Sequence, residues 1–579
     1  MMDVRPWYER YSGLLDEEIS AFKAAGMAPE LDLAAKASGK AVVGIRVMLF
    51  GTIREGCVTY PDLYPYYRPS LDVEGITEAK RHYNPFSGNI CLLRRGTQYW
   101  APENRAASLI IEQRREWEKA ARRSYSDERL ATEDQQAEPI SAYLHPTRQQ
   151  VFVDSSWQIP EGIDQGNVVL MVPKVFGKTQ KRDYSPLWAI QYTTDSGSQS
   201  CHPALIAWVK DLGYKRIDCP WCRIETLPTN PKEIPELVKD SFPKVHNLIC
   251  NRLNKTKKAL FALRFPEEDP HKGIRDGWLF IHVIRKGSGK SAQLLYQHMT
   301  VEYTGEGDIF ERIPELNPLR QKKVAIVGLG CVGAPSVLAL AQAGTGELRL
   351  LDSDHVSPGT ICRWPLGFQV SGKGKGKALA DFITANYPFT RIGTQHYINS
   401  IDGDFRMKIG AIGGDVNQLE VLDKMLEGVD LLYDASTEQG VNHLLCDLAR
   451  ERGIPYITAS SRAGGWGGNV VRVRSDGKTG CYLCYLKYLE DGEFEEPPYD
   501  PEGDELQPVG CGDLTFKAAG FDVQEVALAG VRMAVSTLCE GQGAYPLITG
   551  DVGILRLRVN GTVVFPEWCM TFPPTSLGL

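Results

Sequence analysis

Hydrophobic positions in the N-terminal part of the chain follow two different periods. Residues 1–30 have the spacing of an amphipathic helix. From residue 40, apolar and β-branched residues alternate with polar ones and are interrupted by glycine and proline, as in AVVGIRVMLFG and GCVTYPDLYP. This pattern predicts a meander of antiparallel strands. Residues 112–140 are rich in charge and have no apolar stripe beyond their first turns, which predicts a helix that ends in a linker.

A different pattern begins near residue 316. Short apolar runs such as LRLLD, VDLLYDAS and PYITASS alternate with helical stretches such as KALADFITANY and NHLLCDLARERG. This rhythm predicts βαβ units and a mostly parallel, doubly wound sheet. Between residues 141 and 315 strands and helices mix in an order that does not predict one fold. We therefore expect an α/β multidomain protein with an α+β domain at 1–140, a mixed middle domain of unknown fold at 141–315, and a Rossmann-like domain at 316–579.

Length and composition narrow the class of protein. A chain of 579 residues exceeds what one hydrophobic core usually serves, and 43% hydrophobic with 24% charged residues is typical of a soluble globular protein. The net charge of −7 gives no basic footprint for nucleic acid. No apolar run approaches the roughly 20 residues of a membrane span, and the first residues have no signal-peptide core. We expect a cytoplasmic protein whose 14 cysteines are thiols, metal ligands or nucleophiles rather than disulfides.

A glycine-rich loop follows the apolar strand at residues 324–327. Gly328, Gly330 and Gly333 permit a tight turn and a close backbone approach to phosphate, and the helix that follows offers unpaired N–H groups to an anion. Taken alone, this pattern leaves a nicotinamide dehydrogenase site open, with Asp352 on the ribose hydroxyls. It also leaves open a glycine turn without a ligand.

The residues that come after the glycine loop favour ATP over a nicotinamide cofactor. Arg363 and Lys377 are of the type that neutralises triphosphate charge as it shifts during phosphoryl chemistry. Asp434 ends the strand DLLYD, at the edge of an open sheet where ligands bind, and it could hold magnesium. A dehydrogenase has no need for this set.

Residues from 322 to the C-terminus, most densely 324–440, resemble the adenylation domain of ubiquitin-activating and ThiF/MoeB-type enzymes. The matching motifs fall on Gly328, Gly330, Gly333, Asp352, Asp354, Arg363, Gly374, Lys377 and Asp434. Thr360 and Trp364 stand where the family usually has Asn and Gln. The resemblance implies that a protein's C-terminal carboxylate attacks the α-phosphate of ATP, which yields an acyl adenylate and pyrophosphate. It also implies Asp352 on the ribose, Asp354 near the magnesium, and a homodimer.

An acyl adenylate needs an acceptor, and Cys511 is the first candidate. It lies between two glycines in QPVGCGDLTF, ahead of a helix whose expected start is a capping box at Asp522 and Glu525. Flexible flanks suit a nucleophile that must travel to the adenylate. A structural loop cysteine is the alternative.

Two C-x-x-C pairs are candidates for metal or redox chemistry. Cys481 and Cys484 form half of a possible zinc site, but no second pair follows, so two packed thiols are the alternative. Cys219 and Cys222 lie in the middle region with Cys201 and His202 nearby. We favour a structural role for them, because no βαβ redox context surrounds them.

An upstream stretch resembles the active site of ubiquitin-conjugating enzymes over roughly residues 15–125. The family's His-Pro-Asn, Gly-x-x-Cys-Leu and Trp-x-Pro motifs match His82-Tyr83-Asn84, Gly88 to Leu92, and Trp100-Ala101-Pro102. Tyr83 replaces the usual proline, and the spacing from His82 to Cys91 is one residue shorter. The resemblance implies that Cys91 carries a thioester, in a motif that includes His82, and that Asn84 supports the oxyanion when a lysine attacks.

A conjugating domain followed by an activating domain resembles the ancillary conjugation proteins of bacterial anti-phage CBASS operons. This resemblance implies that an acyl group passes from Cys511 to Cys91 and then to a lysine of a target protein. The modifier would be the C-terminus of a cGAS-like nucleotidyltransferase, or a ubiquitin-like protein in a neighbouring class of operon. A ThiF-type sulfur-transfer or adenylation enzyme without a thioester relay stays open, with the N-terminal domain as a binding module.

Overall fold

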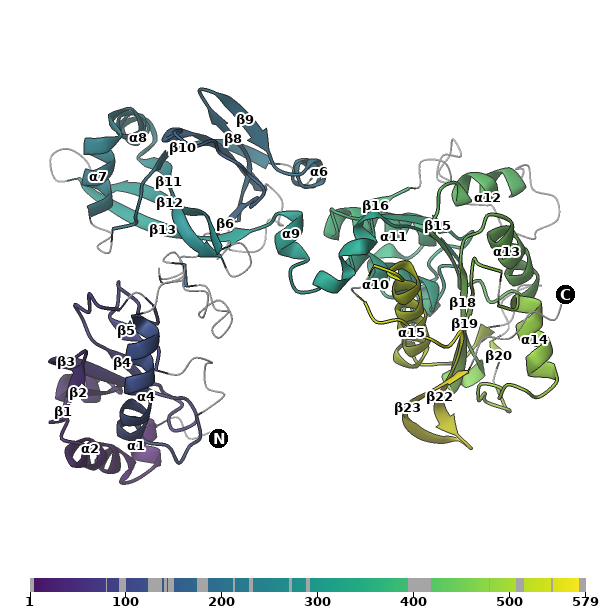
Figure 1. Ribbon diagram of the computed structural model, residues 1–579, viewed down its shortest axis with the longest axis horizontal. Helices are drawn as coiled ribbons and strands as arrows, with labels where there is room; N and C mark the ends of the chain where they lie inside the picture. The colour runs from purple at the N-terminus through teal and green to yellow at the C-terminus, as the bar shows by residue number, and fades with distance from the viewer. Residues whose placement is uncertain are drawn as a thin grey trace. The chain divides into compact units, whose positions relative to one another are not determined.

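The computed structural model describes residues 5–79, 81–92, 100–122, 138–139, 143, 150–173, 186–211, 214–228, 233–269, 273–287, 292–393, 418–477, 479–503, 505–506, 515–542 and 545–571 (Figure 1). The chain forms two compact units. The first comprises residues 1–201 and 212–305, and the second comprises residues 202–211 and 306–579. Within the described residues, no helix is long and apolar enough to cross a membrane.

The N-terminal domain is an antiparallel meander covered by helices. Its elements are α1 (Trp7–Arg10), α2 (Leu14–Ala24), β1 (Glu30–Leu31), α3 (Leu33–Ala37), β2 (Ala41–Leu49), β3 (Thr52–Tyr60), β4 (Ser70–Asp72), β5 (Asn89–Ile90) and α4 (Ala106–Ala121). The strands follow one another in chain order across the sheet, and every pairing is antiparallel. Alternate residues of β2 are buried, as the period of two predicts.

The single helix predicted for residues 1–30 is wrong. Gly13 precedes α2 and has a φ of 87°, a left-handed conformation that glycine adopts without steric cost. The chain therefore turns between α1 and α2 instead of continuing as one helix. Phe22 of α2 is fully buried and packs in the core of this domain.

The middle region is a closed β-barrel. Its strands are β6 (Gln150–Val153), β7 (Gln165–Pro173), β8 (Leu187–Thr194), β9 (Gly197–Ser200), β10 (Tyr214–Arg223), β11 (Lys258–Asp269), β12 (Gly273–Lys286) and β13 (Gln293–Tyr303). They pair in the order β6-β13-β12-β11-β10-β7-β8-β9, and an additional β6–β8 pairing closes the ring. Figure 1 shows α7 (Ile234–Ser241) and α8 (Pro243–Thr256) on the outside of the barrel.

Cys219 and Cys222 face opposite sides of β10. Cys219 is buried in the barrel interior with Trp221, whereas Cys222 is buried under the helices on the outside. Residues three apart on a strand point in opposite directions. Burial raises the pKa of the Cys222 thiol to about 12 and also raises the pKa of the Cys219 thiol. This arrangement agrees with the structural role that the sequence favours.

The second unit is a mixed α/β domain with a Rossmann-like sheet, as predicted. Its strands are β14 (Lys323–Val327), β15 (Glu347–Leu351), β16 (Arg391–Ile392), β17 (Leu431–Asp434), β18 (Tyr456–Ser461), β19 (Gly467–Val473), β22 (Val552–Val559) and β23 (Thr562–Thr571), with a separate pair β20 (Glu505–Leu506) and β21 (Thr515–Phe516). The order is β16-β15-β14-β17-β18-β19-β22-β23. The pairings from β16 to β18 are parallel, and the remaining ones are antiparallel.

Helices cover both faces of this sheet (Figure 1). One face carries α10 (Gly333–Gln342), α11 (Lys375–Asn386) and α15 (Gly520–Leu538), and the other carries α12 (Gln418–Leu426), α13 (Gln439–Glu451) and α14 (Tyr482–Glu490). The unit also contains α6 (Pro203–Asp211), α9 (Glu306–Ile309) and the 3₁₀ turns η4 (Pro314–Gln321), η5 (Pro358–Thr360), η6 (Phe368–Val370) and η7 (Ala463–Gly465). The helix α6 joins this unit through Trp208, whose indole N–H donates to the carbonyl of Ala385.

The predicted capping box at the start of α15 is wrong. The helix begins at Gly520, two residues before Asp522, and its N-cap Ala519 has no side-chain acceptor. Asp522 therefore lies inside the first turn, and its carboxylate is 4.0 Å from the guanidinium of Arg558.

A fully buried ion pair joins β19 to the segment that leads into β22. Arg472 Nε donates to Asp551 Oδ1 at 2.6 Å, and Arg472 Nη2 donates to the carbonyl of Ile548 at 2.7 Å. Both side chains are 0% exposed. Burial lowers the pKa of Arg472, and the charge of Asp551 opposes that shift. Arg474 also donates to Asp551, so one carboxylate serves two arginines.

We predict that Asp551→Asn destabilises the second unit strongly. Removing one partner of a buried ion pair leaves an uncompensated charge and costs about 3–5 kcal/mol. The midpoint of the corresponding transition in differential scanning calorimetry should fall by roughly 10 °C. Asp491→Asn is the control, because Asp491 lies on the surface and pairs with Lys487. An Asp551→Asn protein that unfolds at the wild-type temperature would contradict the prediction.

Candidate functional site

The glycine loop connects β14 to α10 at the carboxyl edge of the parallel strands. Gly328 has a φ of 82°, and a Cβ there would lie 2.5 Å from the backbone of Ala435. A Cβ on Gly333 would lie only 1.8 Å from the Gly328 carbonyl oxygen. Gly330, in contrast, has no atom within 4 Å of its Cβ position. Two glycines therefore permit the turn itself, and the third leaves open space in front of the N-terminus of α10, where an anion binds favourably.

Asp352 holds the glycine loop to the end of β15. Its Oδ2 accepts the backbone N–H of Leu329 at 2.6 Å, and its Oδ1 accepts that of Asp354 at 2.7 Å. Burial raises the pKa of Asp352, and the charge of Lys375 opposes the shift. The carboxylate supports the loop in this arrangement, and its contact with a ribose stays a prediction.

Lys375 is the lysine that approaches the two aspartates. Its Nζ lies 2.8 Å from Asp354 and 3.8 Å from Asp352. The motif lysine, Lys377, forms an exposed ion pair with Asp381 one turn along α11. Sequence reasoning missed Lys375 because the run GKGKGK offers several lysines, and the motif spacing selects only one of them.

Arg363 is hydrogen-bonded to both residues of β21. Its Nη1 donates to the carbonyl of Phe516 at 2.5 Å, its Nη2 donates to Thr515 Oγ1 at 3.1 Å, and its guanidinium lies 5.7 Å from the centre of the Phe516 ring. Cys511 lies outside the described residues, but it is only four residues before Thr515.

Asp434 is fully buried, and protein donors already occupy both of its carboxylate oxygens. Oδ1 accepts the N–H of Ser436 at 2.9 Å, while Oδ2 accepts the Asn442 amide at 2.7 Å and the Tyr456 hydroxyl at 2.8 Å. Burial raises the pKa of Asp434, which these hydrogen bonds oppose. The side chain as arranged does not fit a magnesium ligand, and it orders the end of β17 instead.

Cys481 and Cys484 lie together at the start of α14. Their sulfur atoms are 3.6 Å apart, both side chains are buried, and Cys446 Sγ accepts the backbone N–H of Tyr482 between them. Across the part of the chain that the structure describes, no group of three or more His, Cys, Asp or Glu side chains is arranged to hold a metal ion. These residues therefore do not fit a zinc site in this arrangement.

In the N-terminal domain, backbone hydrogen bonds join residues 82–84, which include His82 and Asn84, to residues 89–91, which include Cys91. The Cys91 N–H donates to the His82 carbonyl at 2.9 Å, and the Asn84 N–H donates to the Asn89 carbonyl at 2.8 Å. His82 is buried and has a φ of 55°, which is uncommon for a residue other than glycine. Its carbonyl also accepts the Trp117 indole N–H at 2.9 Å. The Cys91 backbone is therefore held by the residue that the sequence motif pairs with it.

The side chain of Asn84 has other partners. Its Oδ1 accepts the backbone N–H groups of Phe86 at 2.9 Å and Ser87 at 3.3 Å, and its Nδ2 donates to the carbonyl of Tyr143 at 3.3 Å. In this arrangement the amide shapes the turn before Cys91. Its Nδ2 has a second N–H besides the one given to the Tyr143 carbonyl, and its support of an oxyanion stays a prediction.

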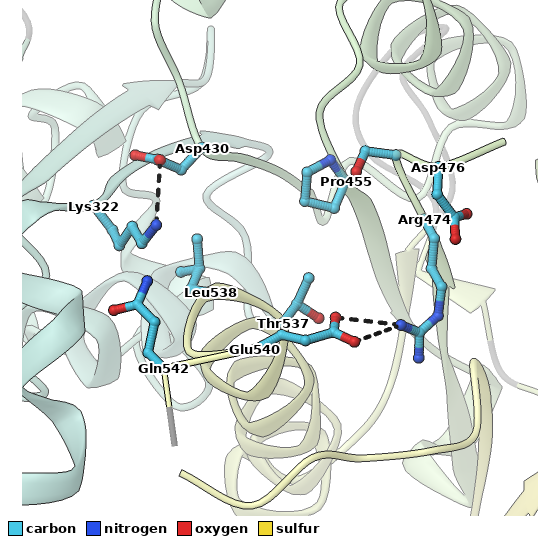
Figure 2. Close-up of a pocket in the computed structure, with 10 residues that line it drawn as sticks. Lys322, Asp430, Pro455, Arg474, Asp476, Thr537, Leu538, Glu540 and Gln542 are labelled. Carbon is cyan, nitrogen blue, oxygen red and sulfur yellow. Dashed lines mark hydrogen bonds and ion pairs between the residues drawn. The ribbon is translucent and has the colours of Figure 1, made fainter. Parts of the chain in front are cut away.

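Two cavities lie at opposite edges of the Rossmann-like sheet. Figure 2 shows one of about 400 Å³ at the amino ends of the parallel strands, where Lys322 faces Asp430 at 3.6 Å and Arg474 faces Glu540 at 3.2 Å. Its charges pair with one another, and ligands of open α/β sheets bind at the other edge. A second cavity of about 580 Å³ lies beside Trp466, after the carboxyl end of β18, and is otherwise lined by residues 496–502 and 560–561.

Comparison with known proteins gives a family match in the second unit and relatives that span most of the chain. The family model described as the ThiF family matches residues 305–513. The uncharacterized protein y4qC of Sinorhizobium fredii (strain NBRC 101917 / NGR234) is 30% identical over 508 residues, which are 83% of this chain and 81% of that protein. The protein y4oA of the same organism is 28% identical over 589 residues, 97% of this chain and 95% of that protein.

Part of the chain is also similar to a ubiquitin transferase-like protein. The ATP-dependent ubiquitin transferase-like protein Cap2 of Pseudomonas aeruginosa (strain BWHPSA011 / Pa011) is 28% identical over 213 residues, which are 35% of this chain and 33% of that protein. The similarity to Cap2 thus extends over about one third of each chain.

We predict that alanine destabilises the protein at one glycine of the loop and not at another. Gly333→Ala should lower the midpoint of thermal unfolding, because its Cβ would clash with the Gly328 carbonyl. Gly330→Ala should leave the midpoint within about 2 °C of wild type, since surface changes usually stay within about 0.5 kcal/mol. Scanning calorimetry of both variants checks this. Equal destabilisation by the two variants would contradict the described loop geometry.

Proposed function

Because the chain belongs to the same protein family as y4qC and carries a ThiF-family domain, we propose that it uses ATP to activate the C-terminal carboxylate of a protein and then conjugates that carboxylate to an amine. The observation that carries the proposal is the anchoring of Arg363 to Phe516 and Thr515. It ties the cation of the nucleotide motif to β21, which follows Cys511 in the sequence. Cys511 is the acyl acceptor in this proposal.

The first step is adenylation. A carboxylate oxygen of the protein substrate attacks the α-phosphorus of ATP, the bond to the β-phosphate oxygen breaks, and pyrophosphate leaves. The glycine loop offers space at Gly330 and the N–H groups at the start of α10 to the phosphates. Burial raises the pKa of the Cys331 thiol in this loop, while the charges of Arg363 and Lys375 oppose the shift. In this proposal, Arg363 and Lys375 stabilise the charge that develops on pyrophosphate.

The later steps transfer the acyl group. The Cys511 thiolate attacks the adenylate carbonyl and AMP leaves, which forms a thioester. The Cys91 thiolate then displaces Cys511, and a lysine amine displaces Cys91 to form an amide. Each exchange retains the activation supplied by ATP, so ATP is consumed once. We place Cys91 in a ubiquitin-conjugating-like domain on the strength of the motif match and the backbone contact between Cys91 and His82.

We further propose that the chain acts as a homodimer on a cGAS-like nucleotidyltransferase, as its resemblance to CBASS conjugation proteins implies. The similarity to the ATP-dependent ubiquitin transferase-like protein Cap2 supports conjugation of a protein, and a ubiquitin-like modifier is the alternative substrate. Magnesium accompanies ATP in this proposal, and no step depends on Asp434 as its ligand. The cavity beside Trp466 lies at the same sheet edge as the glycine loop and offers room for a protein tail.

We predict that Arg363→Ala lowers modifier-dependent ATP–pyrophosphate exchange by about 100-fold or more, because removing one stabilising group from such a site costs that much. Exchange of radiolabelled pyrophosphate into ATP measures the step without any thioester chemistry. Arg450→Ala is the control, since Arg450 lies on the surface of α13 near Asp447. Full exchange activity in Arg363→Ala would exclude this arginine from the nucleotide site.

We predict that Cys91→Ala abolishes conjugation but leaves adenylation intact. With ATP and the candidate modifier, wild type should show a DTT-sensitive adduct on a non-reducing gel, and the variant should lack the adduct at Cys91. Cys57→Ala is the matched control in the same domain, because Cys57 is also a partly buried free thiol.

Two results would redirect the proposal. Unchanged conjugation by Cys91→Ala would refute the relay. An adenylate that passes to sulfur and never to an amine would indicate a sulfur-transfer enzyme, with the N-terminal domain as a binding module.

A further inference from the structure

Glu138 contacts the candidate conjugation site from the segment that follows α4. Its Oε2 accepts the backbone N–H of His82 at 2.5 Å, and its Oε1 lies 2.6 Å from His82 Nδ1. The Glu138 side chain is only 6% exposed. One carboxylate thus binds the backbone N–H of His82, whose carbonyl accepts the Cys91 N–H, and lies at ion-pair distance from its ring.

Tyr143 extends this contact to the third motif residue. Its hydroxyl donates to Glu138 Oε2 at 2.6 Å, and its backbone carbonyl accepts the Asn84 amide at 3.3 Å. Burial and the charge of Glu138 raise the pKa of Tyr143, so the phenol stays protonated and remains a donor to the carboxylate.

The barrel holds Glu138 in turn. The backbone N–H of Glu138 donates to Glu268 Oε2 on β11 at 3.0 Å, and Arg81, next to His82, donates to the same oxygen at 3.0 Å. Phe86, in the turn shaped by Asn84, packs against the apolar cluster on the outside of the barrel. Polar and apolar contacts therefore both connect the Cys91 loop to the barrel.

We propose that Glu138 is a positioning residue for Cys91 and that the middle barrel, through Glu268, is part of the conjugation site. The proposal rests on the proposed function of Cys91. The Cys91 backbone is bound to the carbonyl of His82, which has a left-handed backbone that needs support from its surroundings. Glu138 supplies that support through Oε2, which accepts the His82 N–H, and Tyr143 and Glu268 keep the residue in place.

The charge of Glu138 suits this role. Burial opposes its ionised form, but the hydrogen bonds and charge of His82 outweigh burial and hold the pKa of Glu138 below its usual range. The carboxylate is therefore ionised at neutral pH and can accept from His82 and Tyr143 at once. A glutamine of nearly the same shape has one acceptor oxygen instead of two and cannot accept at its amide nitrogen.

The first test is hydrogen exchange of the full chain followed by mass spectrometry. In Glu138→Gln, amides of residues 82–92 should exchange about tenfold faster or more, because the His82 N–H loses its charged acceptor and hydrogen bonds to charged groups are the stronger ones. Amides of β2 and β3 should not change. Glu112→Gln is the control, because Glu112 lies exposed on α4 of the same domain. Unchanged exchange of residues 82–92 would overturn the proposal.

The second test separates positioning from folding. In a single-turnover assay with a preformed Cys91 thioester, Glu138→Gln and Glu268→Gln should each slow discharge to lysine by about tenfold, and ATP–pyrophosphate exchange should stay at the wild-type rate. Faster hydrogen exchange with normal discharge would also overturn the proposal. If wild type forms no Cys91 thioester, the proposed relay fails, and the hydrogen-exchange result alone decides whether Glu138 holds the loop.

Discussion

Backbone crowding at the glycine loop is the constraint on which the second unit depends. The carbonyl of Gly328 occupies the space that any side chain at residue 333 would need, so β14 passes directly into α10 only with glycine at that position. The same turn aims the N-terminus of α10 at the carboxyl edge of the sheet. Asp352 then fixes the loop to the neighbouring strand through two backbone N–H groups. The space at Gly330 and the positions of the nearby cations follow from this local geometry.

The two candidate reaction centres are built on one physical principle. In each, a side chain that the sequence suggests for direct chemistry is engaged in holding backbone. Asp352 and Asp434 accept protein donors at the nucleotide edge, and Asn84 does the same in the turn before Cys91. Satisfied buried polar groups give a rigid site, since an unpaired one would cost about 1–3 kcal/mol. At the described nucleotide edge, the backbone at Gly330 offers open space to a ligand.

Local patterns predicted the local features. The alternation in β2 and β3 and the βαβ rhythm after residue 316 specify elements whose periods can be read from neighbouring residues. Closure of the barrel depends on β6, whose partners β13 and β8 lie far along the chain, so no short window contains that information. Whether Lys375 or Lys377 approaches the aspartates depends on where α11 begins, because side chains two positions apart on a helix point in clearly different directions.

The short helix α6 has a consequence for how this protein can be divided. Residues 202–211 lie within the first unit's sequence but fold with the second, so the chain passes between the units at 201–202, 211–212 and 305–306. A C-terminal fragment that starts at residue 306 would lack α6, with its hydrogen bond from Trp208 to Ala385 and the contact of the His202 ring with Phe389 at 5.1 Å. A barrel fragment that ends at residue 305 would instead carry that helix without its partners. The two units are therefore not separated by one linker, because a helix from the first unit's sequence folds with the second unit.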